Sequence, residues 1–227
     1  VKSIAPGIPD FQRPTEYIAL KDNKEYAFIT GKIASSDDGT TNLVDYEKVT
    51  NEFCVPHSSS KFAKHKRDSY MVGALSRFNL NSDQLLPKAK KAAKELGMKA
   101  PIHNPFMISV AQTVETVHAL EDAINIIDKL LDRGLHEEEV KVKPRAGRGV
   151  GIVEAPRGML IHDYTYDDNG NIVSANCIIP TGQNHLSIQK DFDALAPTIL
   201  DKPEEEIRHT LEMLVRAYDP CISCSVR

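Results

Sequence analysis

The chain has 227 residues, of which 41% are hydrophobic and 26% charged, the composition of a soluble globular protein. This length can bury a core, so we expect one large domain or a piece of a larger one. The net charge of -4 argues against nucleic acid or an anionic membrane as a partner. No apolar run approaches the ~18 residues of a membrane span. The first residue is Val1 rather than Met, and no signal-peptide pattern follows, so we expect a fragment, a split subunit or a processed product.

The first hundred residues predict short elements. Strands are expected at residues 16–20 and 25–30, and the Ser/Asp/Gly/Thr-rich stretch 35–42 predicts a loop. A basic cluster at 61–67 is interpreted as a solvated surface, because the protein is acidic overall. A helix is expected from Ser82 to about residue 98.

The strongest predicted element is a helix of about thirty residues, ~45 Å long at 1.5 Å per residue. Asn104 is expected to cap it, Pro105 to occupy its first position and Gly134 to end it. Apolar residues recur along it at helical spacing, which predicts a one-sided scaffold helix. His118 lies within this helix, and we interpret it as a packed or surface histidine rather than a metal ligand.

The second half of the chain predicts a hairpin followed by two helices. Residues 141–149 are basic and interrupted by Gly and Pro, which favours a loop. Strands are expected at 149–155, 159–166 and 171–179, with a tight turn at 167–170. A helix of about ten residues is expected around 187–195. The last helix is expected to begin at Pro203 and to end at Asp219, which precedes a proline.

Four cysteines are too few for a disulfide scaffold. Cys54 and Cys177 are expected to be small buried core residues. Cys221 and Cys224 have the spacing of a metal-binding or redox pair. A zinc site requires a second pair of ligands, and no second CxxC or suitable histidine pair is present. A thioredoxin-like motif requires a CxxC that opens a helix after a strand. The spacing alone leaves metal binding, redox pairing and an accidental pair of thiols open.

Two further segments combine chemistry with a constrained backbone. Glu-Ala-Pro-Arg-Gly at 154–158 places Arg157 directly after a proline between two strands, from where a guanidinium can reach an anion or a metal ligand. Taken alone, such a residue is more often an ordinary surface arginine. Pro-Thr-Gly-Gln-Asn at 180–184 ends the returning strand and is rich in short polar side chains; taken alone it predicts a helix-capping loop.

These features in combination resemble the catalytic large subunit of nickel–iron hydrogenases. The terminal DPCxxC, the EAPRG that precedes a strand and the PT about two dozen residues later are similar to that family's motifs. Residues 57–58 and 69–78, and Asn104-Pro105-Phe106 opening a long helix, are also similar. The GMLIHDY after EAPR is most similar to the cytoplasmic multi-subunit members. The resemblance covers nearly the whole chain, as the C-terminal portion of a large subunit.

The resemblance implies a role for each motif residue. Cys221 would be a terminal thiolate on nickel and a base for the proton from H2, and Cys224 would bridge nickel and iron. Arg157 would lie over the open side of the metals and assist heterolytic cleavage, with Asp219 as its carboxylate partner. The CO and CN ligands of iron would be contacted by three residues: Ala155, Pro156 and Thr181.

The chain departs from the family pattern in two places. The N-terminal RxCGxC motif with the other two nickel cysteines is absent, as is the N-terminal glutamate that relays protons. They are expected on another segment or chain. Family members often end in a histidine that binds a structural magnesium or iron ion, whereas this chain ends in Arg227, so that ion is absent or its charge is replaced.

The implied fold is α+β and mainly helical, with long packed helices and small antiparallel sheets around a deep metal site. Residues 1–227 would be the C-terminal portion of one large-subunit domain. The implied function is reversible cleavage of H2 in the cytoplasm, with an iron–sulfur small subunit as partner. Further partners would be acceptor subunits of the NAD, F420 or heterodisulfide type. The alternatives are a metal-free relative of the complex I type and a CxxC zinc or redox module.

Overall fold

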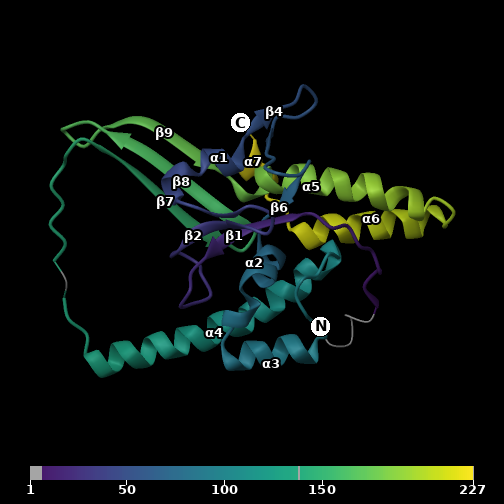
Figure 1. Cartoon of the computed structure of the whole chain (residues 1–227), viewed down its shortest axis with the longest axis horizontal. Helices are drawn as coiled ribbons and strands as arrows, with labels where there is room; N and C mark the ends of the chain where they lie inside the picture. The colour runs from purple at the N-terminus through teal and green to yellow at the C-terminus, as the bar shows by residue number, and fades with distance from the viewer. Residues whose placement is uncertain (1–6, 138, 227) are drawn as a thin grey trace.

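The computed structural model describes residues 7–137 and 139–226, and it is an α+β fold in which helices contribute most of the regular structure (Figure 1). The helices in these ranges are α1 (Glu47–Thr50), α2 (Ala74–Asn81), α3 (Pro87–Glu95), α4 (Ile108–Arg133), α5 (Pro180–Leu195), α6 (Glu204–Tyr218) and α7 (Ile222–Ser225). The strands are β1 (Glu16–Lys21), β2 (Lys32–Ser35), β3 (Gly39–Thr41), β4 (Phe53–Cys54), β5 (Lys61–Phe62), β6 (Tyr70–Met71), β7 (Gly147–Ala155), β8 (Gly158–Tyr166) and β9 (Ile172–Ile178). The predicted fold class is therefore confirmed. In the part of the chain that the structure describes, no helix is long and apolar enough to cross a membrane.

The strands of the described residues form three small sheets. The first has the order β3-β2-β1-β6 and is antiparallel except for the parallel pair β1–β6. β4 pairs with β5, and β7-β8-β9 form an antiparallel sheet. The strand expected at 25–30 is wrong. Residues 25–30 form bends and unpaired backbone instead, and the next strand, β2, begins at Lys32.

The helix expected from Ser82 to residue 98 is wrong in its extent. α2 ends at Asn81, a short 3-10 turn covers Ser82–Gln84, and α3 begins only at Pro87. The break follows from Pro87, because the residue before a proline is disfavoured in the helical region. Leu86 is accordingly extended.

α4 ends as predicted, but it begins at Ile108 rather than at Pro105, because a 3-10 turn covers Pro105–Met107. The Asn104 side chain accepts a hydrogen bond from the Phe106 amide at 3.0 Å, and Gly134 ends the helix with a φ of 80°. Its first half is buried in the core, but its second half extends away from the rest of the chain (Figure 1). His118 is packed, as expected; its Nδ1 accepts from the Leu86 amide, and burial lowers its pKa.

The β7–β8–β9 sheet and its turns confirm the predicted hairpin. The Asp167 carboxylate accepts hydrogen bonds from the amides of Asn169 and Asn171, which fixes the turn before β9. α5 is longer than expected, because it begins at Pro180, where a proline needs no amide partner. The last helix, α6, has the predicted bounds and is followed by the four-residue α7.

Two hydrophobic clusters form the core. One lies among α2, α3, α4 and α6, and includes Phe78, Val114 and Leu214. The other lies between the first sheet and the β7–β8–β9 sheet, and includes Ile18 and Ile161. The turn between β7 and β8 and the ends of α5 and α6 meet where these clusters adjoin, and this is where the predicted site residues lie.

Candidate metal centre

Arg157 lies in a two-residue connection between β7 and β8, in which Ala155 pairs with Gly158. The connection packs directly on the backbone at Val72 and Gly73. A Cβ atom at Gly158 would lie 2.3 Å from Val72 Cγ2, and one at Gly73 would lie 2.9 Å from the Arg157 carbonyl oxygen. Both glycines also have positive φ, 134° and 103°. Side chains at these two positions would therefore push the turn away from the core.

Behind the turn lies Arg77, which is 1% exposed. Its Nη1 donates to the Ala155 carbonyl at 2.9 Å, and its Nη2 donates to the Pro156 carbonyl at 3.2 Å. The same guanidinium pairs with Glu115 at 2.6 Å and with Glu154 at 2.8 Å. The Arg77 cluster, defined as Arg77, Glu115 and Glu154, thus holds the backbone of the turn from inside the core.

The opposite charges of the Arg77 cluster stabilise one another. Burial disfavours charge on Arg77, but the Glu115 and Glu154 carboxylates raise the pKa of the guanidinium, which stays protonated. Burial raises the pKa of Glu154, and Arg77 opposes that shift. The Leu20 amide also donates to Glu154, at 2.7 Å. Because removal of one member would leave a buried charge without its partner, the cluster fixes one arrangement of the turn.

The first turns of α5 hold the other side of the loop. Asn184 Oδ1 accepts from the Val72 amide at 2.9 Å, and its Nδ2 donates to the Arg157 carbonyl at 3.2 Å. Gln183 Nε2 donates to the Met159 carbonyl at 2.6 Å. The side chains that follow Thr181 therefore attach the β7–β8 turn to α5.

Asp219 brings the end of α6 to the Arg157 side chain. Arg157 Nη2 lies 3.1 Å from Asp219 Oδ2, and its Nε donates to the Asp219 carbonyl. Asp219 has a φ of 49°, the left-handed geometry with which the chain leaves α6. The preceding Tyr218 is buried and donates to Asp191 at 2.6 Å, an aspartate whose pKa burial raises. The predicted pairing of Arg157 with Asp219 is present in the structure.

The cysteine pair, Cys221 and Cys224, follows Asp219 in the chain. The Cys221 amide donates to Thr181 Oγ1 at 3.1 Å, which ties the terminal segment to the start of α5. Cys221 and Cys224 are joined as a disulfide with a Cα–Cα distance of 5.3 Å. A strand bridge between Ser60 and Val226 closes the segment.

The cysteine pair fits one half of a metal site. Reduction gives two neighbouring thiolates, the soft donors that suit nickel. Among the described residues no group of three or more His, Cys, Asp or Glu side chains could hold a metal ion. In this chain Cys221 is half-buried and Cys224 is exposed, so the expected depth of the site depends on residues outside the chain. The remaining ligands and the cover of the site must come from other residues.

The predicted site residues otherwise come together. Arg157 contacts Asp219, Cys221 contacts Thr181, and the carbonyls of Ala155 and Pro156 accept from Arg77. Sequence reasoning misses the function of Arg77 of α2, which contacts the turn, and of Glu115 of α4, which pairs with Arg77. The sequence signal that could have identified them is a pair of charged residues at helix positions that face the core. Arg227 lies outside the described residues.

Two expectations for other reactive residues are wrong. Cys54 is exposed rather than buried, because β4 is a short edge strand. Cys177 is only partly buried, with its sulfur 3.8 Å from the Tyr164 hydroxyl and 3.6 Å from His162 Nδ1. Both lie outside the chain of contacts around Arg157.

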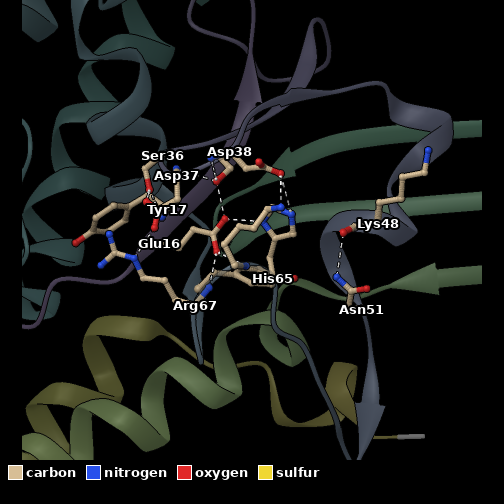
Figure 2. Close-up of polar contacts among 12 residues, drawn as sticks. Glu16, Tyr17, Ser36, Asp37, Asp38, Lys48, Asn51, His65 and Arg67 are labelled. Carbon is tan, nitrogen blue, oxygen red and sulfur yellow. Dashed lines mark hydrogen bonds and ion pairs between the residues drawn. The ribbon is translucent and has the colours of Figure 1, made fainter.

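The basic cluster at 61–67 is only partly a solvated surface. Figure 2 shows His65 between Glu16 and Asp38; Nδ1 lies 2.6 Å from Glu16 Oε1, and Nε2 lies 3.6 Å from Asp38 Oδ2. Glu16 is completely buried and also accepts from the Ser35 hydroxyl at 2.5 Å. The expectation is therefore wrong for His65, which ties the 65–67 segment to β1 and β2. Arg67 is exposed and pairs with Asp37.

Comparison with known proteins identifies a family. A family model described as nickel-dependent hydrogenase matches residues 57–227. The alpha subunit of sulfhydrogenase 1 from Pyrococcus furiosus is 34% identical over 221 residues, which are 96% of this chain and 51% of that protein. The alpha subunit of sulfhydrogenase 2 from the same organism is 34% identical over 81% of this chain and 44% of that protein.

Similarity extends to solved structures. The crystal structure of an NAD+-reducing [NiFe]-hydrogenase in the H2-reduced state superposes with a TM-score of 0.79 at 26% identity, over 99% of this chain and 53% of that one. The beta subunit of the NAD-reducing hydrogenase HoxS from Cupriavidus necator is 29% identical over 90% of this chain and 45% of that protein. The chain spans about half the length of the relatives that it matches, and it belongs to the nickel-dependent hydrogenase family.

Proposed function

We propose that this chain is the C-terminal part of the catalytic subunit of a nickel–iron hydrogenase, which interconverts H2 with protons and electrons. The observation that carries the proposal is a pair of contacts, Arg157 with Asp219 and the Cys221 amide with Thr181, which Pro220 links along the chain. They bring a cation, a carboxylate and the cysteine pair into neighbouring segments. The family match supports the same conclusion.

In this proposal Cys221 and Cys224 would hold one side of a nickel–iron centre, which would supply the acceptor for the hydride of H2. The Cys221 thiolate would take the remaining proton of H2, because a thiolate can act as a general base. Since Thr181 already accepts from the Cys221 amide, its own hydroxyl proton remains available to a CN ligand on iron, as expected from the resemblance.

Arg157 is proposed to orient the substrate side of the centre. Asp219 accepts hydrogen bonds from Nε and Nη2 of the guanidinium. Nη1 is therefore the group that can face H2 or the leaving proton. The attachment of the turn to Arg77 fixes the position of Arg157, which is the preorganisation that electrostatic catalysis requires.

The rest of the enzyme is also part of the proposal. A segment with RxCGxC supplies the other two thiolates, and a glutamate relays the proton. An iron–sulfur small subunit takes the electrons and passes them to subunits of the NAD, F420 or heterodisulfide type, in the cytoplasm. Ala155 and Pro156 would contact the CO and CN ligands of the iron. A structural magnesium or iron ion near the C-terminus remains a proposal, because Arg227 lies outside the described residues.

The two alternatives are less well supported. A metal-free relative of the complex I type would have no use for Cys221 and Cys224. A zinc or redox module accounts for the disulfide, but it does not account for the Arg157–Asp219 pair beside it. The match to the hydrogenase family over residues 57–227 also opposes it.

The proposal is tested with the anaerobically purified complex, by H2-dependent reduction of benzyl viologen. Arg157→Lys is expected to retain nickel and iron but to lower the rate on the order of a hundredfold, because Lys lacks the planar fork. Arg148→Lys is the matched control. Arg148 also pairs with an aspartate, Asp163 at 2.7 Å, but at the far end of β7, and its activity is expected to be unchanged. Equal activity of the two variants would contradict the role of Arg157.

A further inference from the structure

One face of α5 carries three polar side chains that are almost completely buried. Asn184, Ser187 and Asp191 follow one another at spacings of three and four residues, so they lie on the same side of the helix. Their exposed fractions are 3%, 0% and 1%. A helix normally turns apolar residues toward the core, and buried polar groups require partners. We name these three residues the α5 polar stripe and ask what its partners do.

The two ends of the α5 polar stripe hold the two members of the Arg157–Asp219 pair. Asn184 Nδ2 donates to the Arg157 carbonyl at 3.2 Å. At the other end, Asp191 Oδ2 accepts from the Tyr218 hydroxyl at 2.6 Å, and Tyr218 is the last residue of α6, directly before Asp219. α5 and α6 run side by side (Figure 1). One helix face therefore sets how the backbone of Arg157 lies relative to that of Asp219.

Arg13 completes the far end of the stripe. Its Nε pairs with Asp191 Oδ1, and its Nη2 donates to Ser187 Oγ at 2.7 Å. Asp191 thus uses one carboxylate oxygen for Arg13 and the other for Tyr218. Burial raises the pKa of Asp191, and the Arg13 guanidinium opposes that shift. An ionised carboxylate accepts a stronger hydrogen bond than a neutral group does, so Arg13 strengthens the hold on Tyr218.

Tyr218 in turn determines where Asp219 lies. Tyr218 is 3% exposed, and the next residue leaves α6 with a φ of 49°. Asp219 provides both acceptors of Arg157, its carbonyl for Nε and its carboxylate for Nη2. A displacement of Tyr218 would move both acceptors together. In a catalytic site a shift of about 1 Å can lower the rate by about a hundredfold.

We propose that Tyr218 and Asp191 are positioning residues, which hold the Arg157 guanidinium in place through Asp219. This inference rests on the proposed function of Arg157. The Arg77 cluster holds the backbone of the Arg157 turn, whereas Tyr218 and Asp191 hold the partner of its side chain. The two sets of contacts therefore act on opposite ends of one residue. Neither Tyr218 nor Asp191 contacts the cysteine pair.

The test uses Tyr218→Phe in the anaerobically purified complex, because it removes one hydroxyl and keeps the ring. Nickel and iron should be retained, and the rate of benzyl viologen reduction per bound nickel should fall about tenfold. Independently of the metals, hydrogen exchange at the Asp219 amide, which donates to the Arg216 carbonyl at 3.1 Å, should accelerate about fivefold. Asp191→Asn should give the same changes. Unchanged exchange at this amide in Tyr218→Phe overturns the proposal.

Tyr46→Phe is the matched control. The buried Tyr46 also donates to an aspartate, Asp163 at 3.0 Å, and that aspartate also pairs with an arginine, Arg148 at 2.7 Å. This second set of Tyr, Asp and Arg lies at the other end of the β7–β8 pair. Both the rate and the exchange at the Asp219 amide should stay as in wild type. Equal effects of the two Tyr→Phe variants would overturn the proposal.

A double-variant cycle separates positioning from stability alone. Tyr218→Phe is introduced into Arg157→Lys, and the rates per bound nickel are compared. If Tyr218 acts through Arg157, the second change should lower the rate by about twofold or less. A further loss of about tenfold would overturn the proposal, because the hydroxyl would then act by another route. An Arg157→Lys variant as active as wild type would refute the proposed function instead, so the two failures are distinguishable.

Discussion

The loop that carries Arg157 and the segment that carries the two cysteines lie side by side, yet the chain holds them by different contacts. The loop is bound to the fully buried Arg77 and packs against Gly73 without space for a side chain. The cysteine segment is a short exposed helix, attached through Thr181 and a strand bridge at Val226. One side of the candidate centre is thus formed by the core, and the other lies on its surface.

This difference indicates a division of labour between folding and assembly. The position of Arg157 is fixed once α2, α4 and α5 pack, because their side chains hold the turn. The position of Cys221 depends on fewer buried groups, so metal and partner binding are expected to contribute most of its order. The chain can therefore fold with the Arg157 loop already in place, and the segment with Cys221 and Cys224 becomes ordered last.

The largest effect on the buried side is expected from Arg77→Met. It leaves the Glu115 and Glu154 carboxylates buried without a cation, which we expect to lower the free energy of unfolding by about 3–5 kcal/mol. Denaturant unfolding of the complex measures it. Arg148→Met, at an exposed ion pair, is the control and should leave the unfolding transition nearly unchanged, because solvent screens such a pair. Similar losses of unfolding free energy in both variants would contradict the distinction between the buried and the exposed side of the centre.

A smaller loss is expected from Gly73→Ala. The new methyl group would meet the Arg157 carbonyl at 2.9 Å, and the φ of 103° is unfavourable for alanine. We expect destabilisation of about 2–3 kcal/mol by thermal unfolding. Gly97→Ala separates the two causes, because Gly97 also has positive φ, 70°, but nothing lies within 4 Å; it should cost about 1 kcal/mol. If both glycines behave alike, the close contact with the turn is unimportant.

The smallest effect is expected on the exposed side. Thr181→Val removes the acceptor of the Cys221 amide, worth about 1 kcal/mol, without a change of volume. Hydrogen exchange at that amide should accelerate about fivefold, while the β7–β8 turn keeps its protection. Thr113→Val, in an exposed turn of α4, is the matched control and should leave both unchanged. Equal protection of the Cys221 amide in wild type and Thr181→Val would show that other contacts hold the segment.

The sequence predicts the local parts of this structure better than the long-range ones. Gly134 predicts the end of the longest helix, Asn104 and Pro105 predict the 3-10 turn that leads into it, and the turn at Asp167 predicts the hairpin, because capping and turn chemistry act over a few residues. The start of α5 differs from the prediction because Pro180 is the first helical residue, whereas a proline after a strand is equally typical of a break.

The candidate site likewise has local features that the sequence predicts and long-range contacts that it does not. Arg157, Asp219 and Cys221 are recognised from motifs, and their contacts agree with that recognition. The attachment of Arg77 to Ala155 spans 78 residues, so no local pattern predicts it. The burial of His65 is equally hidden from local patterns, because its partner Glu16 lies 49 residues away. The sequence thus identifies which residues carry the chemistry, while packing decides what positions them.

The central claim is tested most directly by metal analysis and infrared spectroscopy of the anaerobic complex. Wild type is expected to contain nickel and iron together, with infrared bands of bound CO and CN. Cys221→Ser should lose its nickel, because the hydroxyl is a poor soft-metal ligand, whereas Cys54→Ser at an exposed strand should retain both metals. Zinc alone, no metal, or nickel that survives in Cys221→Ser would contradict the account.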